Sequence, residues 1–74
     1  MLILPHTLLV EAADTLFGPN HSRPLGEALG VNERTVRRWL NGDAEIPAGV
    51  WRDVERLALG RRQMLDDLIE RLPR

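Results

Sequence analysis

Three arginines and an asparagine gather on one side of a short helix predicted near the middle of the chain. Residues 33–41 read Glu-Arg-Thr-Val-Arg-Arg-Trp-Leu-Asn. Successive side chains of a helix are about 100° apart, so Arg34, Arg38 and Asn41 share one side and Arg37 lies on its flank. Arginine donates paired hydrogen bonds to guanine O6 and N7, and it also binds phosphate. This side therefore suits a nucleic-acid groove, unless it is only a solvated helix face rich in arginine.

Residues at the start of this helix and before it are further candidates for the same surface. Glu33 and Thr35 stand at its start, where a carboxylate can accept a hydrogen bond from cytosine N4. Asn32 precedes the helix, and we expect it to cap the helix and to lie within the same nucleic-acid surface. Arg23 stands at the start of the preceding helix, where it either meets a phosphate beside the free helix amides or is an ordinary surface arginine.

The elements that must position these side chains are two short helices joined by a tight turn, over residues 22–42. Gly30 ends the first helix, because glycine accepts the left-handed backbone that closes a helix C-terminus. Asn32 caps the second helix, which runs from 33 to 41 and stops at Gly42, a second C-terminal glycine. The side opposite the arginines docks the helix on its own domain and consists of Val36, Trp39 and Leu40.

This stretch resembles the helix-turn-helix of phage repressor/Cro-type (XRE-like) DNA-binding domains. The positions that carry the resemblance are Gly26, Leu29-Gly30-Val31 at the turn, Val36, Trp39 and Asn41-Gly42. The resemblance implies a lambda-repressor-like fold and sequence-specific binding of double-stranded DNA by a transcriptional regulator, with the second helix in the major groove. It further implies that Arg23 and Asn41 hold phosphates. We expect Arg34 and Arg38 to reach base edges and Arg37 to reach a base or a phosphate.

Two positions depart from the pattern of that family. Gly26 stands where alanine is commoner, and glycine is expected to weaken the first helix of the motif by about 1 kcal/mol. Glu33 stands where the family often has an uncharged polar residue. The departures leave the spacing of the motif unchanged.

The segment before the motif predicts an extended start, one helix and a loop. Residues 1–5 are expected to be extended, since a residue before proline avoids the helical region. Thr7 is expected to cap the helix, which ends at Gly18-Pro19-Asn20. Its apolar stripe, at i, i+3 and i+4 spacing, consists of Leu8, Leu9, Ala12, Ala13, Leu16 and Phe17. Ser22 is expected to cap the next helix, with Pro24 in its first turn.

After the motif, Pro47 opens one long helix from about residue 48 to residue 72. Its apolar stripe keeps one phase along the helix and consists of Val50, Val54, Leu57, Ala58, Met64, Leu65, Leu68 and Leu72. Gly60 permits a kink, so two helices remain an alternative. The first half is expected to pack on the first helix and on Trp39. The prediction is an all-α fold, a small bundle of four to five helices in a single domain over residues 1–74.

The second half of that long helix has an apolar face with little left to cover inside one chain. It can fold back on the first helix and Leu2-Ile3-Leu4, pair with a second copy, or dock a different protein. We favour a homodimer, because two-fold pairing buries the face and doubles the DNA contacts. The expected interface consists of Met64, Leu65, Leu68 and Leu72.

Composition limits the function classes. The ten basic residues are all arginine, and with eleven carboxylates the net charge is −1, whereas a DNA-binding domain is often basic overall. Between residues 23 and 41, however, the chain holds four arginines and two glutamates, so positive charge concentrates on the motif. The alternative is a protein–protein module, an antitoxin-like or adaptor subunit that uses the long C-terminal helix.

Other classes of function find no support in the sequence. With no cysteine, neither a disulfide nor a thiolate metal site can form. His6 and His21 lack a carboxylate or second histidine at ligand spacing, so they are expected to be loop or cap residues. No Ser/His/Asp set or phosphate loop is present; we expect no enzyme activity, cofactor or small-molecule substrate. No apolar run spans a membrane, and Pro5 and Glu11 follow the apolar start too soon for a signal peptide, which favours the cytoplasm, at the nucleoid when bound to DNA.

Overall fold

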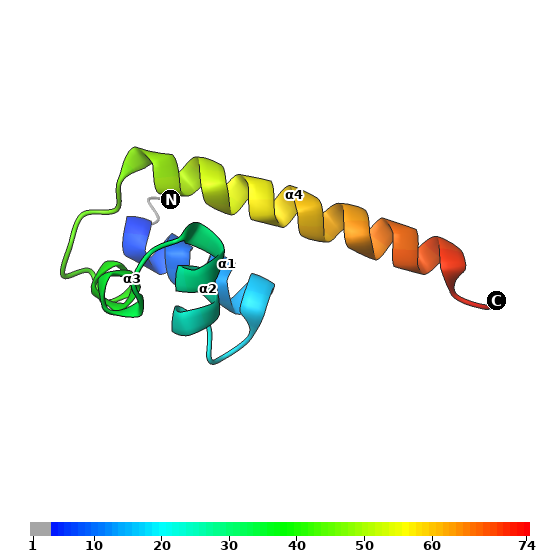
Figure 1. Ribbon diagram of the computed structural model, residues 1–74, viewed down its shortest axis with the longest axis horizontal. Helices are drawn as coiled ribbons and strands as arrows, with labels where there is room; N and C mark the ends of the chain where they lie inside the picture. Colours follow the sequence, from blue (N-terminus) through cyan, green and yellow to red (C-terminus); the bar gives the residue numbers. More distant parts are fainter. Residues whose placement is uncertain (1–3) are drawn as a thin grey trace.

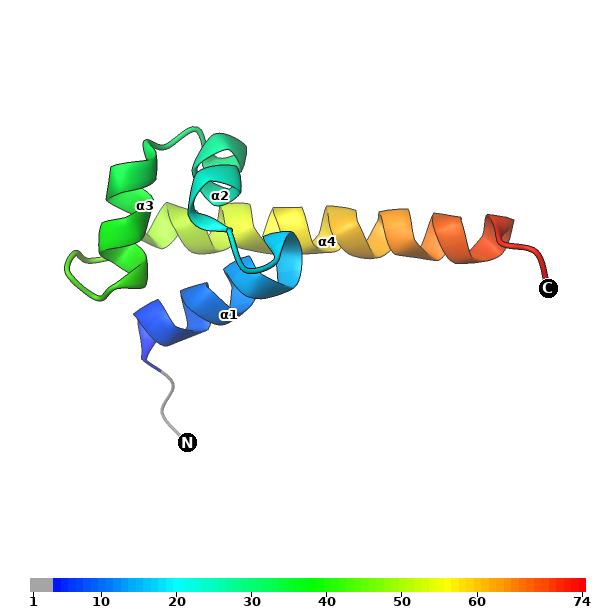
Figure 2. The ribbon, with the colours of Figure 1, turned by 90° about the horizontal axis from the view of Figure 1, so that it is seen from below.

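Four helices make up the protein in a computed structural model that describes residues 4–74 (Figure 1). They are α1 (Pro5–Phe17), α2 (Ser22–Leu29), α3 (Glu33–Leu40) and α4 (Ala48–Arg71). The first three helices gather at one end of the molecule, and α4 runs along them and far beyond them (Figures 1 and 2). The predicted all-α bundle with a long C-terminal helix is confirmed, with four helices in the described part of the chain.

One apolar core joins all four helices. Leu9, Leu25 and Val36, from the first three helices, are fully buried at its centre. The other buried side chains of the core are Ala13 and Leu16 of α1, Trp39 and Leu40 of α3, and Val50 and Val54 of α4. Each of these helices presents one apolar stripe to the common centre. Leu8, predicted in the stripe of α1, lies at its edge and remains 41% exposed.

The turn between α2 and α3 has the predicted backbone. Gly30 adopts the left-handed conformation, with φ 69° and ψ 32°. The Val31 amide donates to the Gly26 carbonyl at 2.8 Å, which closes the end of α2. Asn32 Oδ1 accepts from the Thr35 amide at 3.2 Å and so caps α3, as predicted.

Gly26 allows the turn to approach α2 closely. A Cβ atom at this position would lie 2.7 Å from the backbone oxygen of Val31. The sequence-based view of Gly26 only as a weakness of the helix is therefore incomplete. Its helical cost of about 1 kcal/mol accompanies a packing geometry that a larger residue would force apart.

The start of α1 differs from the prediction. Thr7 does not cap the helix, because α1 begins at Pro5 and the extended Leu4 takes the N-cap position without a side-chain bond. His6, expected in a loop or a cap, therefore lies in the first turn of α1. Proline tolerates that first position because its missing amide would have no partner inside the helix. The rest of the predicted extended start, residues 1–3, lies outside the described residues.

Two further boundaries, at α2 and α3, differ from the prediction. Ser22 does not cap α2, because it is the first helical residue and His21 precedes it as N-cap. Helix α3 ends at Leu40 and not at Asn41, which becomes the C-cap. Each shift is one residue, so the helix faces keep the residues that the sequence assigned to them.

Helix α4 continues without a break through Gly60, which decides between the two alternatives in favour of one helix. Val50 and Val54 are buried, and Trp51 and Leu57 pack partly against the core. From residue 58 onward every residue is exposed. The alternative in which the second half folds back on α1 is therefore wrong for the described chain. None of the helices in residues 4–74 is long and apolar enough to cross a membrane.

Candidate nucleic-acid interface

Helix α3 presents its charged side to solvent because its apolar side holds it in the core. Val36, Trp39 and Leu40 are buried with at most 8% exposure, while the polar side is exposed and consists of Arg34, Arg37, Arg38 and Asn41. The helix lies at the end of the molecule opposite the C-terminus, across the direction of α4 (Figure 2). A surface in that place is open to a partner as large as a duplex.

The arginines of this surface differ in their ion pairs. Arg37 Nη2 lies 2.9 Å from Glu33 Oε1, one turn earlier on the same helix. Within residues 4–74, no carboxylate lies within salt-bridge distance of Arg34 or Arg38. Since four residues of helix rise about 6 Å, these two guanidinium groups can contact positions roughly two base pairs apart.

Among the other residues predicted for this surface, some take part in a cap or an ion pair, and some have exposed polar groups. Glu33 is half-buried and one of its carboxylate oxygens is held by Arg37, so a cytosine would share that carboxylate with Arg37 or displace it. Thr35 is half-buried, with its amide bonded to the cap. Asn32 uses its side-chain oxygen in that cap and is itself exposed, which leaves its amide nitrogen for a phosphate. Asn41, exposed at the end of α3, is open to the same role.

Arg23 lies on α2 and is paired, although loosely. Its Nε atom lies 3.3 Å from Glu27 Oε1, and both side chains are mostly exposed. A surface pair of this kind contributes little energy, so a phosphate can compete for the guanidinium group. Arg23 and Glu33 also line one shallow hollow of about 230 Å³ with the α1–α2 loop, so the starts of α2 and α3 are neighbours.

His21 is the N-cap residue of α2, as expected for a loop or cap residue, but it has a carboxylate neighbour that its sequence spacing did not indicate. Its Nε2 atom lies 3.1 Å from Asp14 Oδ1 on α1, and the imidazole is only 13% exposed. The intervening loop reverses the chain, which brings together two residues whose sequence spacing gave no signal. The pair connects the last turn of α1 to the start of α2. Within residues 4–74, no group of three or more His, Cys, Asp or Glu could hold a metal ion.

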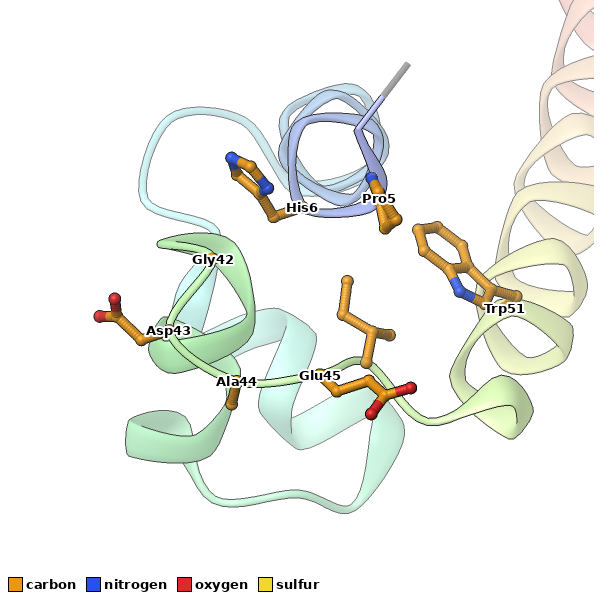
Figure 3. Close-up of a pocket in the computed structure, with 8 residues that line it drawn as sticks. Pro5, His6, Gly42, Asp43, Ala44, Glu45 and Trp51 are labelled. Carbon is orange, nitrogen blue, oxygen red and sulfur yellow. The ribbon is translucent and has the colours of Figure 1, made fainter. Parts of the chain in front are cut away.

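A second hollow, of about 390 Å³, lies where the α3–α4 loop meets the start of α1 (Figure 3). Pro5 and Trp51 lie next to each other on one side of it, whereas the carboxylates of Asp43 and Glu45 point away from each other. These groups do not converge on one point, so no ligand site is formed. The two carboxylates instead place negative charge directly after the arginine-rich helix.

The chain matches no protein-family model, no curated protein and no solved structure in the three comparisons made. Its function is therefore inferred from the geometry of the chain itself.

Proposed function

We propose that the protein binds double-stranded DNA sequence-specifically through α3, as a helix-turn-helix of the phage repressor/Cro type, and regulates transcription. The observation that supports this most directly is the pair Arg34 and Arg38, both free of carboxylate partners within residues 4–74. They lie one turn apart on the exposed side of a helix whose opposite side is locked into the core. Two such arginines on a rigid helix are suited to bidentate contacts with guanine in the major groove.

In this mechanism α3 enters the major groove with its N-terminal half toward the bases. Arg34 and Arg38 read base edges, and Arg37 exchanges its Glu33 partner for a base or a phosphate. Arg23 and Asn41 grip phosphates on either side, and the free amides at the start of α2 face the same backbone. The protein would work in the cytoplasm, at the nucleoid while bound.

The charge distribution favours a contact confined to α3 and its immediate surroundings. With a net charge of −1, the chain as a whole gains little from the field of DNA. Asp43 and Glu45 repel phosphates just beyond the end of α3. Binding is therefore expected to be modest for one chain, because it relies on few phosphate contacts, and to weaken as salt is added.

The test is binding to a random double-stranded DNA pool, with enrichment of bound sequences and titration at two salt concentrations. Arg34→Ala and Arg38→Ala are each expected to weaken binding to the enriched sequence by about 1–3 kcal/mol and to relax preference at one position. Arg52→Ala, at an exposed arginine on α4, is the matched control and should leave affinity unchanged. Absence of binding above background at low salt would overturn the proposal.

A protein-interaction module is the second candidate, because the second half of α4 exposes a continuous apolar face. Charge reversal at Arg34 and Arg38 distinguishes the two functions. It should abolish retention on DNA, whereas a protein partner held by α4 would remain bound.

A further inference from the structure

The second half of α4 carries an apolar face with no cover. We call it the distal face; its members are 43–66% exposed and are Met64, Leu65, Leu68, Ile69 and Leu72. Ile69 was not among the predicted interface residues, although it follows Leu65 by one turn. A helix segment of about fourteen residues is marginal in water when it stands alone, so its stability calls for a packing partner.

The distal face continues the side of α4 that α1 covers. Val54 and Ala58 of α4 line one hollow together with residues of α1, which are Leu8, Ala12 and Leu16. At about 100° per residue, Leu65, Leu68 and Leu72 fall within roughly 40° of Val54 around the helix. Residues 60–63, Gly-Arg-Arg-Gln, separate the covered part from the uncovered part. The distal face therefore begins beyond the part of α4 that α1 reaches, on the same side of the helix.

We propose that this cover is the distal face of a second copy, in an antiparallel pair of α4 helices over residues 61–72. The five half-exposed side chains expose roughly 500 Å² per chain, so complete burial of both faces would approach the lower end of specific interfaces, near 1,200 Å². The same patch meets itself, as a two-fold interface requires. An interface of this size predicts a dimer that dissociates on dilution.

The position of α1 selects the antiparallel orientation. In a parallel pair, the partner's α4 would run alongside residues 54–58, where α1 already lies. In an antiparallel pair, each distal half meets only the other distal half. Each C-terminus then points toward the partner's hollow between α1 and α4, about 200 Å³ in volume, where Leu8 is still 41% exposed.

The position of Arg61 agrees with that orientation. Seven residues after Val54, it falls within roughly 20° of the same direction around the helix, so it lies at the near end of the distal face. A parallel pair would place Arg61 of both chains at one level near the axis, where like charges oppose pairing. With Leu65 level with Leu68 of the partner subunit, the antiparallel pair separates the two Arg61 residues by roughly 16 Å along the helices. Each then lies beside the C-terminal end of the partner's helix, whose dipole favours positive charge.

The antiparallel dimer changes the expected use of two copies on DNA, a consequence that rests on the proposed function. The monomer is 47 Å long, with α3 at the end opposite the C-terminus (Figure 1). Since the paired segments overlap by only about 18 Å, the two α3 helices lie more than about 60 Å apart. Half-sites one turn apart require about 34 Å. The dimer therefore joins half-sites two turns apart or two separate duplexes, and the pairing itself does not depend on DNA binding.

The first test is the mass of the chain without DNA, by sedimentation equilibrium over a hundredfold range of concentration. The wild-type chain should shift from monomer to dimer, and Leu68→Glu should stay monomeric throughout. The control is Leu59→Glu, since Leu59 is 46% exposed on another side of the same helix, in a hollow with Arg52 and Arg56. Leu59→Glu should dimerise like wild type. A wild-type chain that stays monomeric, or equal losses in both variants, would overturn the proposal and leave the distal face to another protein.

The second test is orientation, measured with one spin label per chain. The full sequence contains no cysteine, so Arg52→Cys introduces a single attachment point on the exposed side of α4. Labels in the antiparallel dimer should lie roughly 45 Å apart, and in a parallel dimer under about 30 Å. The shorter distance would refute the antiparallel arrangement.

Discussion

Helix α3 and the second half of α4 are both short helical segments with an exposed side. They differ in how they are held and in the chemistry of that side. Helix α3 has only eight residues, yet three of them are buried in the core, and its outer side is charged. The distal half of α4 has no buried residue, and its largest side chains are apolar. The first segment is held by its own domain and offers charge to a partner. The second is not held by the core, and its apolar side chains are uncovered in the described chain.

This comparison shows how a small domain divides its apolar surface: part of it forms the core that fixes one helix, and part of it stays uncovered on another helix. A chain of 74 residues buries only about 60% of its unfolded surface, so it cannot cover every apolar stripe it carries. Here the core covers the apolar side of α3, the helix that we propose reads a groove. The stripe left over falls where a second chain can reach it.

The largest expected effect tests that division directly. Trp39→Ala, in the core side of α3, should lower the free energy of unfolding by about 3–5 kcal/mol, because it leaves a large cavity. Leu68→Ala, on the distal face, should change it by less than about 0.5 kcal/mol at a concentration where the chain is monomeric. Urea denaturation followed by circular dichroism gives both values. Comparable losses in the two variants would mean that the distal face is packed within the monomer.

The next largest effects on stability are expected at two glycines, Gly26 in the packed helix α2 and Gly60 in the unpacked part of α4. Gly26→Ala should destabilise the fold by about 1–3 kcal/mol, because its Cβ would meet the Val31 carbonyl at 2.7 Å. A Cβ at Gly60 would meet nothing within 4 Å, so Gly60→Ala should stabilise the chain by about 0.5–1 kcal/mol through helix propensity. Both changes are read from the same urea transitions. A gain in stability for Gly26→Ala would show that the turn at Val31 moves away from the added Cβ at little cost in free energy.

Gly26 also marks the limit of what the sequence could predict. The helical stripes, the left-handed Gly30 and the Asn32 cap follow from local rules, because each depends on residues within a turn of one another. The close approach of Val31 to Gly26 and the pair of Asp14 and His21 depend on how helices meet in space, which local spacing does not encode. The caps predicted at the starts of α1 and α2 were wrong, since α1 begins two residues before Thr7 and α2 begins at Ser22 itself.

For the candidate site, the sequence predicted which residues lie on the outer side of α3 but not how they are paired. Arg34, Arg37 and Arg38 look equivalent by type. Only the structure shows that Arg37 is held by Glu33 while the other two are free of carboxylates within residues 4–74. The long helix was predicted as one segment, with a break at Gly60 as the alternative, and its continuity through Gly60 decides how far the distal face lies from the core.

The smallest expected effect on stability comes from a change at Glu33 on α3. This change should alter DNA binding more than folding. Glu33→Gln removes a partly exposed i, i+4 ion pair with a 2.9 Å contact, so the free energy of unfolding should fall by only about 0.3–0.5 kcal/mol. The same change frees Arg37 and removes a negative charge from the start of α3, the helix that we propose contacts DNA. Affinity for DNA, measured by titration at two salt concentrations, should therefore rise by a few fold at low salt, and the gain should shrink as salt is added.

The control for that change is Glu27→Gln, which frees Arg23 on α2 in the same way. Because this pair lies outside α3, its gain in affinity should be smaller and independent of the DNA sequence. If Glu33→Gln instead weakens binding to one enriched sequence while sparing others, Glu33 contacts a base, as a carboxylate does at cytosine N4. Arg37 would then serve to orient that carboxylate, and the ion pair on α3 would be part of the reading surface, whereas the pair on α2 would only tune the charge around it.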